Sequence, residues 1–362
     1  MEKRDVYIWL SSIQGVGFGA IRKLEHYFGD IEEVWKAPGG EIYQALGKRS
    51  KSAVKIVNLR TKEYRQKVRD RLSALEVNTV TIADGDYPQK LKKIYDPPYV
   101  LFYKGHLPKD RPTIGMVGAR NATPYGKWAA KKFAKELTDH GVGIISGLAL
   151  GIDTESHKGA VENRGYTLGV LGSGLDVPYP PTNHQLMENI MNRGAILSEF
   201  FLGEEPLKHH FPQRNRIISG LSDGIVVIEA GEKSGSLITV EYALEQGRDV
   251  FALPGNINCD KSRGTNRLIR EGAKVLVEVE DILTELPGGS TLPSKKQEEK
   301  ISEELSEAET KVYRCLQSRP MDLDTLYCQT GIEVRSLSIV VTSLELKGYI
   351  TRLPGKSFTV NR

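Results

Sequence analysis

Short apolar runs recur through the middle of the chain and alternate with segments of helical periodicity. Between Thr113 and about Glu280, each run ends in a glycine or another small residue, and an amphipathic pattern follows. This alternation predicts βαβ units and a parallel sheet, so the expected fold class is α/β. The predicted strands with their turns lie at residues 113–120, 142–153, 167–176, 195–200, 224–236 and 249–256, with a seventh at 273–279.

The flanking segments have other patterns, which place the domain boundaries. Residues 1–73 show helical periodicity throughout and predict a helical domain. Residues 74–286 begin with a β-rich lead-in, where the pair Pro97-Pro98 excludes a helix, and continue into the α/β core. Residues 287–304 are polar and contain Gly, Pro and Ser, which predicts a linker. Residues 305–362 predict a compact, mainly helical C-terminal domain.

The composition is that of a globular protein with two or three domains. The 362 residues are 39% hydrophobic and 27% charged, which excludes a largely disordered chain. No stretch approaches the roughly 18 apolar residues that a membrane helix needs, and the start MEKRDVYIWLSSIQ is not typical of a signal peptide. We therefore expect a cytoplasmic protein without membrane association. The cysteines have no metal-ligand spacing, so no zinc site is expected; they are Cys259, Cys315 and Cys328.

Charge is nearly balanced overall but unevenly distributed. The chain has 50 basic and 46 acidic residues, yet residues 48–71 contain ten Lys or Arg and two acids. This basic segment is either a solvated helix face or a surface that meets phosphates.

Glycines near the N-terminus offer a second candidate phosphate contact. Gly15, Gly17 and Ala20 mimic a dinucleotide fingerprint, but no buried strand precedes them, which excludes that interpretation. A helix–hairpin–helix explains them better, because small residues let backbone amides approach a phosphate. Gly47 would mark a weaker second copy. The alternative is a glycine turn that only packs, and it stays open.

Glycines and serines also follow most of the predicted strands. The carboxyl ends of parallel strands meet at one edge of a sheet, where ligands bind, and exposed backbone amides suit phosphates. Each glycine could instead make only a tight turn. The candidate residues at this edge are Gly118, Ser146, Gly147, Gly172, Ser173, Gly174, Gly235 and Ser236, with Ser234 and Gly255 at equivalent turns.

The segment EPLKHHFPQRNR carries most of the candidate chemistry. Lys208, Arg214 and Arg216 provide cations, with His209 and His210 between them. Phe211 lies among these cations, and Asn215 stands between the two arginines. Cations that contact phosphates and a ring that stacks on a base are what single-stranded nucleic acid needs. The alternative is a salt-bridged helix start with Phe211 in the core.

Arg120 ends the first strand of the core and is expected to project over the same edge. Its guanidinium matches a phosphate in geometry, whereas the alternative is an ion pair with Asp153 or Glu199. Asp153 and His157 have helical spacing, but no third metal ligand is evident. A helix-capping Asp and a buried His explain that pair better than a metal site.

Several enzyme classes lack their motifs in this sequence. There is no Walker-type loop, no dinucleotide fingerprint after a strand and no nucleophile elbow. These absences argue against a Walker-type ATPase, an NAD-dependent enzyme and a serine hydrolase, and no cofactor or metal is expected.

Several long motifs together resemble the DNA-processing protein A (DprA/Smf) family. The matching runs are VGARNATPYG, SGLALGIDTESHKGA, LGSGLDVPYPPTNHQL, FPQRNRIISGLSDGIVVIEAGEKSGSLITVEYALEQGRDVFALPGN and GTNRLIREGAK, which cover nearly all of residues 113–275. The lead-in DGDYPQKLKKIYDPPYVLFYKG is also similar to the family's. A serine is usual where Ala119 stands, which removes one possible hydroxyl contact.

The resemblance implies a fold and a function. The fold is an extended Rossmann-like sheet that dimerises, with an N-terminal module like a sterile alpha motif. The implied function is to bind single-stranded DNA, protect it and promote loading of the RecA recombinase in natural transformation, without catalysis. The family's glycine–small–arginine loop, lysine–phenylalanine step and arginine–asparagine–arginine helix start fall on residues 118–120, 208–211 and 214–216. The implied dimer surface lies around Leu268, Ile269 and Val275.

The C-terminal segment is similar to a winged helix. We expect a first helix near 306–317, a second with Leu323, Leu326 and Tyr327, a third over 333–346, and after Gly348 a two-stranded wing around Pro354-Gly355. Winged helices usually place the third helix in a DNA groove. Here its cations Arg335 and Lys347 are offset by Glu333 and Glu345, which favours protein contact or weak DNA binding.

One enzyme class remains as the alternative function. Rossmann-like nucleotide phosphoribohydrolases have a similar phosphate-binding edge, and EAGEKSGSLITVEYALEQG would give a small-residue loop followed by Glu241 on a helix. A small-molecule hydrolase does not need the broad basic strip at residues 208–216.

Overall fold

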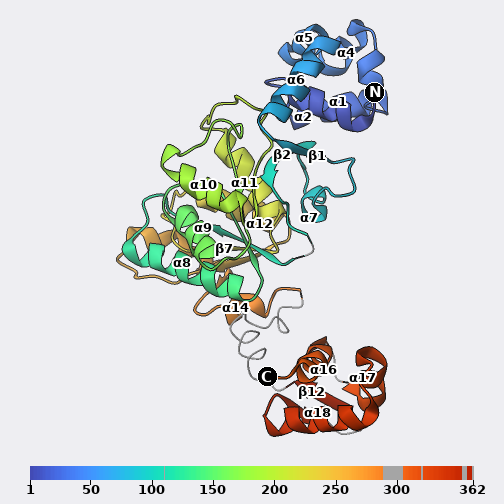
Figure 1. The fold of residues 1–362 in the computed structure, drawn as a ribbon. Helices are drawn as coiled ribbons and strands as arrows, with labels where there is room; N and C mark the ends of the chain where they lie inside the picture. The colour runs from blue at the N-terminus through green and yellow to red at the C-terminus, as the bar shows by residue number, and fades with distance from the viewer. Residues whose placement is uncertain (110, 288–304, 319–320, 353–356, 361–362) are drawn as a thin grey trace. The chain divides into compact units, whose positions relative to one another are not determined.

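The chain forms two compact units, Met1–Leu286 and Pro287–Arg362 (Figure 1). The structure is a computed structural model that describes residues 1–109, 111–287, 305–318, 321–352 and 357–360. The predicted linker at 287–304 lies outside the described residues except for its first position. Within the described ranges, no helix is long and apolar enough to cross a membrane.

A sheet of nine described strands forms the centre of the first unit, in the order β1-β2-β6-β5-β4-β3-β7-β8-β9. Strands β3 to β9 pair in parallel, whereas β2 is antiparallel to both β1 and β6. All seven predicted core strands are present, which confirms the α/β class. The strands are β1 (Asn78–Thr81), β2 (Val100–Gly105), β3 (Thr113–Val117), β4 (Gly143–Ser146), β5 (Thr167–Val170), β6 (Ala195–Ser198), β7 (Gly224–Val227), β8 (Asp249–Ala252) and β9 (Lys274–Val275).

Helices cover both faces of the sheet, which explains why β3 to β7 are buried at every position. Right-handed crossovers place α8, α9 and α10 on one face and α11 and α12 on the other. Consistent with this, α8 packs on α9, and α11 packs on α12. Their bounds are α8 (Pro124–Asp139), α9 (Ile152–Glu162), α10 (His184–Met191), α11 (His210–Gly220), α12 (Ser236–Glu245) and α13 (Arg263–Arg270); short elements are α7 (Gln89–Lys92), η1 (Pro181–Asn183), η2 (Asp260–Ser262) and α14 (Glu280–Leu283).

The strand order reverses at β3. The chain runs outward from β3 through β4, β5 and β6, and then crosses back to β7 on the other side of β3. In open α/β sheets, such a switch point opens a crevice at the carboxyl ends of the strands. The sequence could not give this order, and it determines which turns meet.

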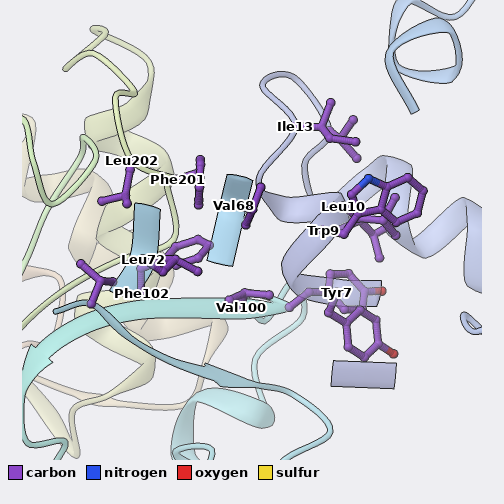
Figure 2. Packing of buried hydrophobic residues seen from close by; sticks show 14 of the residues in the cluster. Tyr7, Trp9, Leu10, Ile13, Val68, Leu72, Val100, Phe102, Phe201 and Leu202 are labelled. Atoms are coloured by element: carbon purple, nitrogen blue, oxygen red, sulfur yellow. The ribbon is translucent and has the colours of Figure 1, made fainter. Parts of the chain in front are cut away.

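Residues 1–73 are helical, as predicted, and share a hydrophobic cluster with the sheet. Val68 and Leu72 lie in one buried hydrophobic cluster with Val100 and Phe102 of β2 and with Phe201 (Figure 2). The helices therefore belong to the same compact unit as the core. They are α1 (Lys3–Ser11), α2 (Phe18–Phe28), α3 (Glu33–Lys36), α4 (Gly39–Leu46), α5 (Lys51–Asn58) and α6 (Lys62–Ala74).

The glycine turn between α1 and α2 has the shape of a helical hairpin. Gly15 has a φ of +86°, which a side chain would strain, and Gly17 precedes the first residue of α2. The Lys55 ammonium donates to the Gln14 carbonyl at 2.7 Å, and the Ser52 hydroxyl donates to the Gly15 carbonyl at 2.9 Å. These bonds fix the turn to α5. Its contact with a phosphate stays a prediction.

The described residues of the second unit form three helices and a three-stranded sheet of order β10-β12-β11. The helices agree with the predicted ones, and Met321–Asp322 adds a strand to the expected pair. The wing tip at Pro354-Gly355 lies outside the described residues. The elements are α16 (Glu307–Ser318), β10 (Met321–Asp322), α17 (Leu323–Thr330), α18 (Val334–Leu346), β11 (Ile350–Arg352) and β12 (Ser357–Val360).

Candidate nucleic-acid interface

A pocket of about 360 Å³ opens at the switch point of the sheet. It is bounded by the loop after β3, the turn after β4 and the first turns of α11 and α12. Among the residues predicted from the sequence, those that line it are Gly118, Arg120, Lys208, Phe211, Arg214, Asn215, Gly235 and Ser236. The other lining residues are Val117, Ala149, Asp153, Pro212, Ile218, Ser234, Ile238 and Thr239.

Arg120 and Phe211 form the centre of this pocket. The Arg120 guanidinium carbon lies 5.2 Å from the centroid of the Phe211 ring, within the range of a cation–π contact. Arg120 is exposed and makes no ion pair within the described ranges, so neither Asp153 nor Glu199 neutralises it directly. Its charge is therefore available to an anionic ligand.

Phe211 is half-buried rather than part of the core. Its ring lies 5.5 Å from the ring of Tyr179, centroid to centroid, and still lines the pocket. A Cβ on Gly172 would come within 3.1 Å of the Phe211 ring, so this glycine makes room for the aromatic side chain. Lys208 is exposed at the start of the same segment. Phe211 therefore lines the pocket together with two exposed cations, Arg120 and Lys208.

Arg214 lines the pocket but is buried, and its bonds go to the backbone. Nη1 donates to the carbonyls of Gly147, at 2.7 Å, and Val170. Nε donates to the Asn215 side chain at 3.2 Å. Burial lowers the pKa of Arg214 to about 10. This arginine therefore ties α11 to the carboxyl ends of β4 and β5, a role that the sequence did not indicate.

Arg216 requires a correction, because it lies outside the pocket. Its side chain is 1% exposed and forms ion pairs with Glu199 at 2.6 Å and Asp96 at 2.8 Å. Burial opposes the charge, but the two carboxylates outweigh it and raise the pKa of Arg216. The prediction that Arg216 contacts phosphate is wrong in this geometry; it is the interior ion pair that the sequence offered as the alternative.

The serines and glycines of the predicted edge fall into two groups. Ser234 and Ser236 lie with their hydroxyl oxygens 2.8 Å apart, and Gly235 between them is exposed at the pocket. Ser146 and Ser173 are instead buried, and their hydroxyls donate to the carbonyls of Met116 and Val177.

Three glycine amides of the predicted edge are already bonded within the chain. Gly174 donates to the Glu204 carbonyl at 2.9 Å, Gly147 to the Asp153 carboxylate at 3.2 Å, and Gly255 to the Asn266 side chain at 3.1 Å. At these three positions the structure therefore agrees with the alternative, in which the glycine serves the turn and its amide is not offered to a ligand. Gly118 and Gly235 remain at the pocket surface.

Asp153 is a pocket residue whose role the sequence did not reveal. It is buried in the first turn of α9 and accepts hydrogen bonds from the amides of Gly147 and Ala149. Asp153 therefore stabilises the preceding turn. The prediction that it caps its own helix is wrong. Burial raises the pKa of Asp153 to about 6, although the nearby Arg214 guanidinium lowers it.

His157 is buried on the same helix and does not join a metal site. Its Nδ1 lies 2.7 Å from the Thr167 hydroxyl, and burial lowers the pKa of His157 to about 3, so the ring is neutral. Within the described ranges, no three His, Cys, Asp or Glu residues gather to hold a metal.

The predicted dimer residues lie near the β9 edge of the sheet but differ in exposure. Val275 is exposed on β9 itself. Leu268 is buried in the chain's own core, and Ile269 packs against the same cluster. Leu268 is therefore corrected to a core residue of α13.

In the second unit, α18 occupies the position of the third helix of a winged helix. Lys347 at its C-terminal end pairs with Glu309 at 2.9 Å, and Ser343 donates to the same carboxylate at 2.6 Å. Burial alone would raise the pKa of Glu309, but these bonds and that from Ser306 hold it at about 2. Arg335 is exposed at the start of α18.

Known proteins are similar to this chain in sequence and in fold. The family described as DNA recombination-mediator protein A matches residues 78–287, and the DprA winged helix domain matches residues 296–356. Protein Smf of Synechocystis is 33% identical over an alignment that covers 99% of both chains. DNA processing protein DprA of Bacillus subtilis is 48% identical over 58% of this chain and 72% of its own.

Solved structures agree with these sequence matches. DNA processing protein A from Streptococcus pneumoniae superposes with a TM-score of 0.66 at 37% identity, over 79% of this chain and 99% of that one. A structure describing the single-stranded DNA binding mode of DNA processing protein A from Helicobacter pylori gives a TM-score of 0.51 at 30% identity, over 57% of this chain and 94% of that one. The chain therefore belongs to the DNA recombination-mediator protein A family, the DprA/Smf proteins.

Proposed function

We propose that this protein binds single-stranded DNA in the pocket at the switch point, protects it and promotes loading of the RecA recombinase during natural transformation. The observation that carries the proposal is that two exposed cations, Arg120 and Lys208, line one pocket with the half-buried ring of Phe211. Cations track a phosphate backbone and a ring stacks on an unpaired base, with little sequence preference. The Helicobacter pylori relative, described by its single-stranded DNA binding mode, supports the same ligand class.

Each side chain has a role in this proposal. Arg120 and Lys208 contact phosphates, Phe211 stacks on a base, and Gly118, Gly235 and Ser236 offer small surfaces for close approach. Arg214 acts as a positioning residue, because its guanidinium is spent on the carbonyls of Gly147 and Val170. Asn215 accepts from Arg214 and completes the pocket wall.

The geometry does not favour the phosphoribohydrolase alternative, so we propose a protein without catalytic activity. Glu241, which that alternative requires at the ligand, is exposed on α12 and is not among the residues that line the pocket. Glu229 is buried at the end of β7 and accepts hydrogen bonds from the Thr123 amide and hydroxyl at the start of α8. The residue that caps the first helix of the core is thus held by the chain's own carboxylate, and the start of such a helix is a common phosphate site in nucleotide-binding folds.

A dimer completes the proposal. Val275 on the edge strand β9 is exposed together with Val277, and Ile257 is exposed in the loop after the neighbouring strand β8. An exposed apolar patch at a sheet edge is typical of an interface between subunits. The proposed protein is therefore a homodimer located in the cytoplasm, as the family resemblance implies.

Binding of a fluorescent oligo-dT and of the matching duplex tests the function. We expect tight binding of the single strand that weakens steeply as salt increases, because bound phosphates release counterions. Weak duplex binding is expected, since its bases are not free to stack on Phe211. A preference for the duplex, or release of free base from nucleoside monophosphates, would overturn the proposal.

A further inference from the structure

Helix α8 carries two aromatic side chains that the proposed pocket does not use. Trp128 is 57% exposed and Tyr125 is 51% exposed. Their ring centroids lie 5.9 Å apart with an interplanar angle of 30°, so the two rings form one continuous apolar surface. The other tryptophans differ, because Trp9 is buried and Trp35 packs edge-on against it at 5.0 Å. An exposed aromatic pair of this kind is a candidate surface for binding a ligand.

The start of α8 is held rigidly beside the pocket. The helix begins at Pro124, just after the loop that carries Arg120, and Thr123 caps it by accepting from the Gly126 amide at 3.0 Å. A Cβ on Gly126 would lie 2.3 Å from the Glu229 carboxyl carbon, so the Gly126 side of the helix is pressed against the core. With helical spacing, Tyr125 and Trp128 consequently project away from the sheet.

The charges around the two rings select an anionic partner. The Lys132 ammonium lies 5.6 Å from the Trp128 ring, and Lys127 is exposed between the two aromatics in sequence. From Pro124 to Lys135 the helix contains no acidic residue; Glu136, the first, pairs with Lys132 at 3.7 Å. Aromatic rings interleaved with lysines match single-stranded nucleic acid, whose bases stack while its phosphates seek cations.

We propose that Tyr125 and Trp128 form a stacking platform for nucleotides that leave the pocket past Arg120. The platform rests on the proposed function, since the pocket must first hold a strand. Bases beyond those in the pocket stack on the two rings, and Lys127, which forms no ion pair within the described ranges, contacts their phosphates. The strand is thereby led along α8, and the protein's site is longer than the pocket alone. The partner is the same DNA strand, so affinity must depend on strand length.

Tryptophan fluorescence of the full-length protein tests this platform, because Trp128 is the exposed one of the three tryptophans. Oligo-dT strands of increasing length are titrated, and their binding is measured independently by anisotropy of a label. Short strands that fill the pocket are expected to bind without quenching, and longer strands to quench Trp128. The quenching disappears in Trp128→Phe while the affinity is kept, because phenylalanine still stacks.

Alanine substitution measures what the platform contributes. Trp128→Ala is expected to weaken binding of long strands at least about fivefold, the loss that removal of one stacked base gives, and to leave short strands unaffected. Tyr95→Ala is the matched control, since Tyr95 is an 83% exposed aromatic residue outside α8 and the pocket. Unchanged affinity of Trp128→Ala for every length, or absence of quenching by long strands that bind, would overturn the platform but leave the pocket intact. Failure of the wild-type protein to bind any strand would overturn both.

Discussion

Replacing Arg120 by alanine isolates the contribution of one phosphate contact. The side chain is exposed, pairs with no acid within the described ranges and touches the Phe211 ring by its guanidinium. Its removal therefore leaves the interior bonds of Arg214 and Asp153 in place. A change in binding can then be assigned to the lost charge rather than to a disturbed fold.

The size of the effect follows from two contributions. A charge-assisted hydrogen bond is worth about 1.5 kcal/mol or more, which corresponds to an increase in Kd of about tenfold at low salt. Neutralising one fewer phosphate also lowers the slope of log affinity against log salt by about 0.7 for single strands. Over a fourfold increase in salt, the difference between wild type and variant should therefore shrink by a factor of about 2.6.

Anisotropy of a labelled oligo-dT, titrated at about 50 and 200 mM salt, measures both quantities. Arg193→Ala serves as the matched control. Arg193 is exposed directly before β6, at the amino ends of the parallel strands and so at the edge opposite the pocket. Parallel salt plots for wild type and Arg120→Ala, or an equal loss in Arg193→Ala, would refute a phosphate contact at Arg120.

Three further predictions follow from buried charges. Arg216→Met is expected to lower the free energy of unfolding by about 3–5 kcal/mol, because Glu199 and Asp96 lose their shared cation. Urea unfolding measures this change, and a loss below about 1 kcal/mol would contradict the prediction. The pKa of Asp153 is raised to about 6, and a bound phosphate raises it further. Binding of the strand therefore takes up a proton, and affinity grows as the pH falls from about 8 to about 6. Asp153→Asn should remove that part of the pH dependence, and identical pH profiles of affinity for the two proteins would disprove the coupling. The pKa of Glu309 is held at about 2. The stability that Glu309 gives to the folded C-terminal unit is therefore complete above the ordinary pKa of 4.5 and is lost as the pH falls towards 2. Glu309→Gln should abolish this acid sensitivity, as measured by hydrogen exchange of the C-terminal unit in the full chain.

The sequence predicted the strands and the pocket opening because both depend on local patterns. Each core strand is a short apolar run that ends in a small residue, and the parallel sheet buries those runs completely. Arg120 and Lys208 were also predictable, since Arg120 directly follows a strand and Lys208 begins a cluster of basic residues in a loop. The strand order was not predictable, because it depends on which crossovers reverse direction.

Arg214 and Arg216 show where residue types alone mislead. Side chains that are two positions apart on a helix point in nearly opposite directions, so only one of the two arginines can face the pocket. The sequence contained this restriction, since a helix start was predicted there. It did not contain the choice between them, which depends on Glu199 and Asp96 from distant parts of the chain.

The carboxylates at the edge of the sheet explain why a polymer suits this pocket better than a free nucleotide. Glu229 accepts from the amide of Thr123, which caps α8, and Asp153 accepts from the amides after β4. Backbone amides at two places that could bind a terminal phosphate are therefore already bonded within the chain. What remains for a ligand is mainly side chains at an open rim, led by Arg120, Lys208 and Phe211. Each such contact is weak and indifferent to base identity, and affinity then requires several of them along one strand. A single nucleotide satisfies too few of them, whereas a strand that continues past Arg120 onto α8 satisfies them together.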